Sequence, residues 1–113
     1  MQSMEDMLKA AQQAAEKIQQ QMNEAQVKLD AVEVEGVSGG GLVKIRATAK
    51  GRILGVAIDD SLIVPADKQM LEDLVAAAFN DARAKADARA GEEMGNVQQG
   101  LGLPPGLNLP GFG

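Results

Sequence analysis

Basic side chains are the residues of this chain best suited to chemistry with a partner, because lysine and arginine bind phosphate and carboxylate groups. The 113-residue sequence holds 11 of them. The densest group is Lys44, Arg46, Lys50 and Arg52. The first three share one face of a predicted strand, from which they could contact phosphates. Glu33 and Glu35 are expected on the same face of the neighbouring strand, so ordinary cross-strand ion pairs are the alternative.

Three further lysines lie on a predicted first helix, at Lys9, Lys17 and Lys28. Glu5 precedes Lys9 by four residues, and Glu24 precedes Lys28 by four, which is the favourable order for an ion pair within a helix. Lys17 has glutamines at those offsets and is the least neutralised of the three. All three could contact phosphates, and solvated helix surface is the alternative.

A last basic group, Arg83, Lys85 and Arg89, crowds the end of a predicted second helix. Cations there complement the negative end of the helix dipole, which is a structural role. Contact with phosphates is compatible with that role.

The residue types that most often perform catalysis are missing, since the chain contains no His, Cys, Tyr or Trp. Asp59 and Asp60 are adjacent and point apart at a strand end, so they predict neither a metal site nor an acid–base pair. The loop at Ser38–Gly41 lacks the Lys-Ser/Thr pair of a phosphate-binding loop and precedes a strand. We therefore expect no catalytic residues, no metal, no cofactor and no small-molecule substrate.

Composition argues partly against a nucleic-acid partner, because the net charge is −5 and the pI is near 4.6. Residues 32–58 are the exception, with four basic against two acidic side chains. No apolar run is long enough to span a membrane, and the polar N-terminus shows no signal peptide. The absence of Cys fits a cytosolic protein.

The longest predicted element is a helix over residues 3–30, with Ser3 as its N-cap. Apolar residues recur on it with alternating gaps of four and three, at Met4, Leu8, Ala11, Ala15, Ile18, Met22, Ala25, Leu29 and Val32. This seam is one side chain wide, which suits a partner helix better than a broad core. The helix is therefore expected to project as an arm or to pair with a second copy.

The apolar period then changes to two, which predicts three short antiparallel strands. Val32 and Val34 begin the first, and residues 36–41 form a loop. The second strand covers residues 42–49, with Val43, Ile45 and Ala47 on its core face. Lys50-Gly51 makes a tight turn, and the third strand covers residues 52–59, with Leu54, Val56 and Ile58 on one face.

A second helix is predicted over residues 66–90, with Pro65 near its first position and Gly91 at its end. Its apolar face is expected to cover the Val43/Ile45 face of the sheet and consists of Leu71, Leu74, Val75, Ala78, Phe79, Ala82 and Ala86. Residues 91–113 hold seven of the 13 Gly and three of the four Pro, which predicts a disordered tail. The chain is thus expected to be α+β, with one domain over residues 1–90 and a tail over 91–113.

Several segments together resemble the YbaB/EbfC family of bacterial nucleoid-associated proteins. They are Val34–Ile45, Gly51, Ile58–Leu62, Asp67–Ala82, Leu103–Gly106 and Leu109–Phe112. The resemblance covers nearly the whole chain in the right order.

The resemblance implies a non-enzymatic, tweezer-like homodimer that has a shared sheet and projecting helices. It implies binding of double-stranded DNA with little sequence preference, a cytoplasmic location in the nucleoid, and organisation or protection of the chromosome with possible effects on transcription. The resemblance places DNA contacts on the helical arms, so the candidate DNA contacts are Lys9, Lys17, Lys28, Arg83, Lys85 and Arg89, followed by Lys44, Arg46, Lys50 and Arg52. The candidate dimer contacts are Leu8, Ala15, Ile18, Met22, Leu29, Val43 and Ile45. The competing hypothesis is a protein-interaction adaptor or holdase-like clamp that grips a protein between its helical arms.

Overall fold

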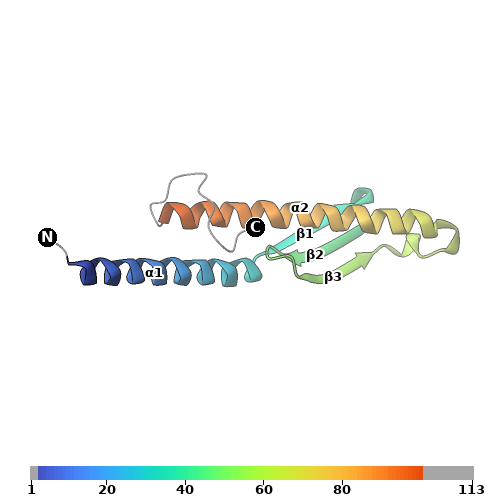
Figure 1. The fold of residues 1–113 in the computed structure, drawn as a ribbon. Coiled ribbons are helices and arrows are strands. Elements are labelled where there is room, and N and C mark those ends of the chain that lie inside the picture. The colour runs from blue at the N-terminus through green and yellow to red at the C-terminus, as the bar shows by residue number, and fades with distance from the viewer. Residues whose placement is uncertain (1–2, 101–113) are drawn as a thin grey trace.

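The computed structural model describes residues 3–100, which form two long helices and one small sheet (Figure 1). The order is α1 (Met4–Ala31), β1 (Glu33–Ser38), β2 (Val43–Thr48), β3 (Ile53–Ile58) and α2 (Lys68–Gly100), with short 3-10 turns at Gly39–Gly41, Asp60–Leu62 and Pro65–Asp67. The predicted α+β class and the order of its elements are confirmed. The molecule is elongated, with extents of 77 × 22 × 17 Å.

Helix α1 begins as the sequence predicts, since the Ser3 side chain accepts a hydrogen bond of 3.1 Å from the Asp6 backbone N–H. Its apolar seam has two different environments. Ala25 and Leu29 are buried against α2, whereas Met4 and Leu8 are exposed. Only the last turns of α1 therefore belong to the packed part of the molecule, and the first turns project beyond the end of α2 (Figure 1).

The sheet is an antiparallel meander in the order β1-β2-β3. Strand β1 continues through Gly36, Val37 and Ser38, so the prediction that a loop starts at Gly36 was wrong. These residues pair with Ile45, Lys44 and Val43 of β2, and the pairing overrides the turn preference of glycine. Only Gly39–Gly41 form the connection, with positive φ at all three glycines.

The third strand differs from its predicted pattern because of an irregularity opposite Arg46 and Ala47. Gly55 pairs with Arg46 and Ile53 with Ala47, which leaves Leu54 as the extra residue of a bulge. Ile53, Val56 and Ile58 therefore share the face that β2 buries, and Leu54 does not belong to it as predicted.

Helix α2 runs to Gly100, so the predictions that it ends at Gly91 and that residues 91–100 are a disordered tail were wrong. Contact with α1 explains the extension, because Val97 is buried and Glu93 pairs with Lys28 at 3.1 Å. Tertiary contacts of this kind outweigh the intrinsic cost of glycine in a helix. Residues 101–113 of the predicted tail lie outside the described residues.

The core lies between α2 and the first two strands, and it consists of Val43, Ile45, Leu62, Ala78 and Ala82. Alanines at every fourth position of α2 (residues 78, 82 and 86) are fully buried and let the helix lie close to the sheet. Phe79 was predicted on this face, but it is 41% exposed and points to one side of the sheet contact.

Side chains of α2 also bind the outer edge of β1. Asp81 accepts a hydrogen bond of 2.9 Å from the Val37 backbone N–H, and Lys85 donates one of 2.8 Å to the Glu35 carbonyl oxygen. Ser38 donates a third, of 2.6 Å, to the Leu74 carbonyl oxygen. Because β1 is an edge strand, the bonds to Val37 and Glu35 satisfy backbone groups that would otherwise face solvent.

Candidate nucleic-acid interface

The basic residues divide into those held in ion pairs and those that are free to bind a partner. Six of the ten predicted DNA contacts are paired, namely Lys28, Arg46, Arg52, Arg83, Lys85 and Arg89. The other four have no ion pair within residues 3–100, namely Lys9, Lys17, Lys44 and Lys50. A free lysine can bind a phosphate without first giving up a carboxylate.

Two of the free lysines, Lys9 and Lys17, lie on the projecting part of α1. The predicted Glu5–Lys9 pair is not among the ion pairs of the described residues, and Lys28 pairs with Glu93 of α2 rather than with Glu24. At about 100° per residue, Lys9 and Lys17 both lie about 140° around the helix from the centre of the seam. They are about 12 Å apart along the axis at 1.5 Å per residue. Asp6 and Glu16 lie on the same outer side of the helix, so Lys9 and Lys17 are two free cations on a face of mixed charge.

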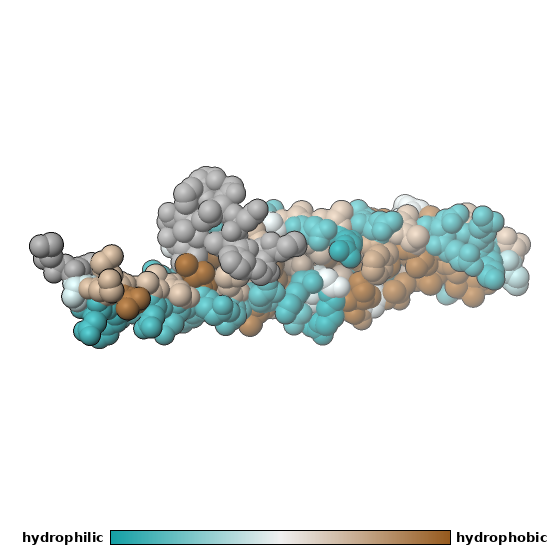
Figure 2. Space-filling model, viewed as in Figure 1, coloured by the Kyte–Doolittle hydropathy of each residue, from teal (hydrophilic) through white to brown (hydrophobic). Residues whose placement is uncertain are grey.

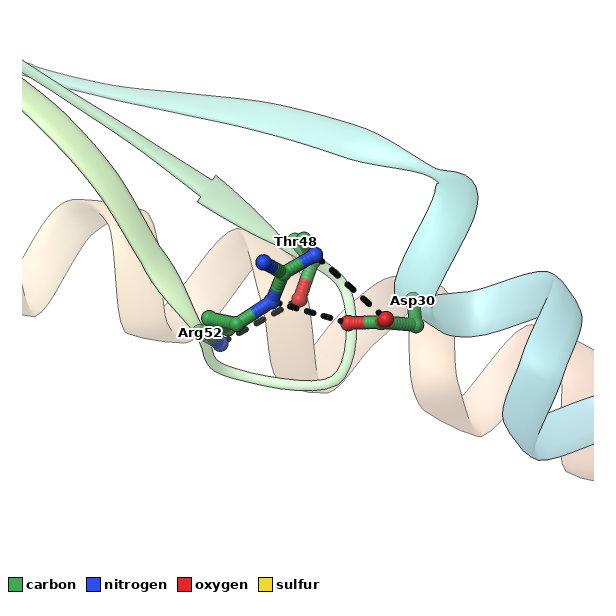
Figure 3. A network of polar contacts seen from close by, with 3 residues as sticks. All are labelled: Asp30, Thr48 and Arg52. Atoms are coloured by element: carbon green, nitrogen blue, oxygen red, sulfur yellow. Dashed lines mark hydrogen bonds and ion pairs between the residues drawn. The ribbon is translucent and has the colours of Figure 1, made fainter.

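The sheet group is partly neutralised, as the sequence predicts. Arg46 pairs with Glu33 at 3.7 Å on the solvent face of the sheet. Arg52 reaches from the β2–β3 turn to the last turn of α1, where Nε donates to Asp30 Oδ1 at 3.2 Å (Figure 3). The Arg52 backbone N–H also donates to Thr48 Oγ1, so this arginine joins the sheet to α1. Lys44 and Lys50 remain as the free cations of the sheet.

The α2 group has a different position from the predicted one. Arg83, Lys85 and Arg89 lie in the interior of a helix that continues to Gly100, so they do not complement a helix C-terminus. Lys85 pairs with Asp81 at 2.9 Å and is bound to β1, which makes it a structural residue. Arg83 and Arg89 make longer pairs on the helix surface, to Asp87 and Glu92.

Two carboxyl groups have shifted pKa values. The Val37 backbone N–H, followed by Lys85, lowers the pKa of Asp81. Hydrogen bonds from Ser61 lower the pKa of Asp59, which caps the 3-10 turn after β3. Both shifts stabilise the ionised carboxylate in a structural role. No group of side chains suited to a metal ion occurs within residues 3–100.

The predicted dimer contacts differ in how deeply their side chains are buried. Val43, Ile45 and Leu29 are buried inside the single chain, so their side chains have no surface left for a partner. These three residues therefore belong to the packed interior of the single chain. Ile18 and Met22 are half-buried, while Leu8 and Ala15 are exposed.

A second apolar surface was missed by the sequence analysis. Helix α2 covers β1 and β2 and leaves the apolar face of β3 open, so Ile53 and Val56 are exposed together with Phe79. Figure 2 shows hydrophobic side chains gathered beneath α2, over β3 and the segment after it. A groove of about 210 Å³ lies here, with Ile53, Phe79 and small alanines along it and Lys50 and Arg83 among its polar lining residues. We call Ile53, Val56 and Phe79 the β3 face.

The fold and the site together define an elongated binding protein with two unpaired lysines on its arm and an uncovered apolar sheet face. None of the helices within residues 3–100 has the length and apolarity needed to cross a membrane. Residues 1–101 match the model of the YbaB/EbfC DNA-binding family, and the chain belongs to that family. It is a family of DNA-binding proteins and not of enzymes.

Relatives support this assignment over nearly the full length. A nucleoid-associated protein of Rhodopseudomonas palustris is 51% identical over 106 residues, which cover 94% of this chain and 99% of that protein. One of Nitrobacter hamburgensis is 50% identical over 106 residues with the same coverage. The crystal structure of an uncharacterized protein from Helicobacter pylori has the same fold, with a TM-score of 0.69 and 18% identity over 86% of this chain and 98% of that one.

Proposed function

We propose that this chain is a nucleoid-associated protein that binds double-stranded DNA as a homodimer through phosphate contacts, with little sequence preference. Membership in a DNA-binding family and relatives named as nucleoid-associated proteins support this function. Its role is to organise or protect the chromosome in the cytoplasmic nucleoid, with effects on transcription as a consequence of coating the DNA.

The observation that carries the proposal is the pairing state of the basic residues. Lys9 and Lys17 are unpaired, exposed and on the one element that projects from the body of the molecule. Phosphate contacts hold a duplex without reading its bases, so a face of this composition accounts for binding with little sequence preference. Lys44 and Lys50 add two free cations on the sheet.

The β3 face supports the homodimer. Val56 is 52% exposed and Phe79 41% exposed, and an apolar surface of this kind on a small domain marks an interaction site. A second copy is the simplest occupant, because a two-fold axis through this surface would pair two identical open faces. The arms of the two chains would then project from one central body, in a tweezer-like arrangement.

Fluorescence anisotropy with a labelled duplex of about 30 bp, titrated at several salt concentrations, tests the DNA-binding proposal. We expect saturable binding whose logarithm falls linearly with the logarithm of salt concentration, because phosphate contacts release counterions. A protein shown to be dimeric that fails to bind at low salt would instead support the protein-clamp hypothesis. Equal affinity for unrelated duplex sequences is expected, and strong discrimination between them would contradict phosphate-only contact.

A further inference from the structure

The exposed first half of the α1 seam is an apolar helix surface that no described residue covers. Met4 is 79% exposed, Met7 60% and Leu8 59%, and the nearby alanines at 11, 14 and 15 are exposed as well. The described part of helix α2 extends to Gly100, and a Cβ atom built there would lie 3.7 Å from Gln21 Oε1 of α1. About 25 Å of α1 thus extends beyond the end of α2 at 1.5 Å per residue. We call residues 4–15 the arm tip.

The second half of the same seam already packs against a helix. Ala25 and Leu29 are buried, and Val97 of α2 is buried among the residues of the α1–α2 contact. The arm tip repeats the same spacing of apolar residues without a break. It is therefore a continuation of a helix-packing surface beyond the level of Gly100, the last described residue of its partner helix.

We propose that the arm tip docks, in antiparallel orientation, on the arm tip of a second copy of this chain. In an antiparallel pair, each a position of the heptad faces a d position of the partner helix. Leu8 then lies opposite Ala11 of the second copy, and Met4 lies opposite Ala15. The same two contacts recur on the other side of the two-fold axis, so each layer combines one large and one small side chain. A parallel pair would stack Leu8 on Leu8 and Ala15 on Ala15, which separates the helices at one end and leaves a gap at the other.

The positions beside the seam favour the same arrangement. Met7 and Ala14 flank one side, and Glu5 and Gln12 flank the other. In the antiparallel register Met7 lies near Ala14 of the second copy, and Glu5 lies near Gln12. No like charges meet, and no set of charges is present that would select an oppositely charged partner. A surface whose only charged border residue, Glu5, meets an uncharged glutamine, and whose seam is complementary to itself, fits a second copy better than a different protein.

The pairing leaves Lys9 and Lys17 open to a partner, because both lie on the opposite side of the helix from the seam. Through the proposed β3-face dimer, each pair of chains would present two arm tips and could join other dimers. Two DNA-bound dimers would then be held together by their arms. Only this consequence rests on the proposed function, since the docking itself requires neither DNA nor the β3 face.

Cysteine cross-linking tests the docking directly, because the natural chain contains no Cys. Full-length Met4→Cys and Ala15→Cys proteins are prepared, then oxidised separately and as an equal mixture, without DNA. A disulfide requires Cα atoms within about 7 Å. The antiparallel register predicts little cross-linking of either protein alone and conversion of much of the mixture into the mixed disulfide, identified by mass. Gln13→Cys, on the opposite face, replaces Ala15→Cys in the matched control and should not cross-link with Met4→Cys.

Three outcomes would overturn the proposal. Cross-linking of each protein with itself would show parallel arms, and equal cross-linking through Gln13→Cys would show random collision. Absence of the mixed disulfide would show that the arm tip does not bind a second copy. The experiment is repeated with Val56→Asp added, which disrupts the β3 face. If the mixed disulfide still forms in the Val56→Asp background, arm docking does not depend on the proposed β3-face dimer. If it no longer forms, the two cross-linked arms belong to one dimer, and docking between dimers is refuted.

Discussion

Gly36 of β1 lies directly against the backbone of α2 at Ala82. A Cβ atom at position 36 would collide with the Ala82 nitrogen and the Ala78 carbonyl oxygen, and would lie 2.6 Å from the Ala82 Cβ atom. The strand and the helix therefore approach as closely as the backbone allows. This contact sets the distance at which the alanine face of α2 seals Val43 and Ile45.

Gly36→Ala is expected to destabilise the protein, because neither the strand nor the helix can move without disturbing the core. The cost of such overpacking is about 1–3 kcal/mol. Urea unfolding followed by circular dichroism would measure it. A variant as stable as the natural protein would show that α2 can shift away from β1 at little cost.

Gly91→Ala is the opposite case, since a Cβ atom there meets nothing within 4 Å and the residue lies inside α2. Alanine is favoured over glycine in a helix interior by about 0.5–1 kcal/mol. We expect the free energy of unfolding to rise by that amount in the same measurement. A decrease would contradict a continuous helix through residue 91.

Replacing Lys9 and Lys17 together with glutamine is expected to weaken binding to duplex DNA. The slope of log affinity against log salt should fall by about one for each phosphate that the variant no longer binds. The control is the Lys68→Gln/Arg89→Gln protein, which loses the same charge at two residues that are held in ion pairs on α2, away from the groove at the β3 face. Anisotropy titrations compare the two. Equal weakening would mean that net charge matters and that the arm has no special role.

Val56→Asp is expected to convert the proposed dimer to a monomer, because it places a charge in the centre of the β3 face. Sedimentation velocity over a range of protein concentrations would measure the change. Ala57→Asp adds the same charge to the next residue of β3, which lies on the opposite face of the sheet, and should remain dimeric. If both variants stay dimeric, the dimer uses another surface.

Acid should weaken the attachment of β1 to α2. The pKa of Asp81 is lowered in the folded protein from its ordinary value of 3.8, so the contribution of this carboxylate is complete above that value. It is lost as the pH falls through the lowered pKa, since the folded state then takes up the proton that the unfolded chain already holds. The stability difference between the natural protein and Asp81→Asn should therefore shrink as the pH falls below about 4.

Urea unfolding at a series of pH values would measure this difference. Asp73→Asn, on an exposed part of the same helix, is the control. A difference that stays constant down to low pH would show that the Asp81 charge does not contribute.

Local patterns were sufficient to predict most of the fold. The Ser3 cap, the alternation through Val43 and Ile45, and the spacing of the α2 alanines each depend on neighbours in the sequence. The end of α2 could not be predicted in this way, because Gly91 and Gly95 remain helical only where Lys28 and Leu29 of α1 support the helix. The exposed β3 face was missed for a similar reason, since a strand pattern does not show how far a helix reaches across the sheet.

The ion pairs of the basic residues could also be predicted only in part. The cross-strand pair of Arg46 and Glu33 follows from strand register and was expected. The pairs Lys28–Glu93 and Arg52–Asp30 join residues from different elements, so only the folded chain shows that these cations are occupied. Ten basic residues were candidates from the sequence, and the fold separates four free lysines from the rest.

The bonds from Asp81 and Lys85 to β1 also determine at which edge the sheet could pair with a further strand. One edge is closed by a helix, and the other, at β3, has its outward backbone groups unpaired among the described residues. Such a sheet can add a strand at one side only. Two copies joined at their open sides would leave no free edge for a third, so extension of this sheet stops at a pair of chains and cannot continue into a fibre.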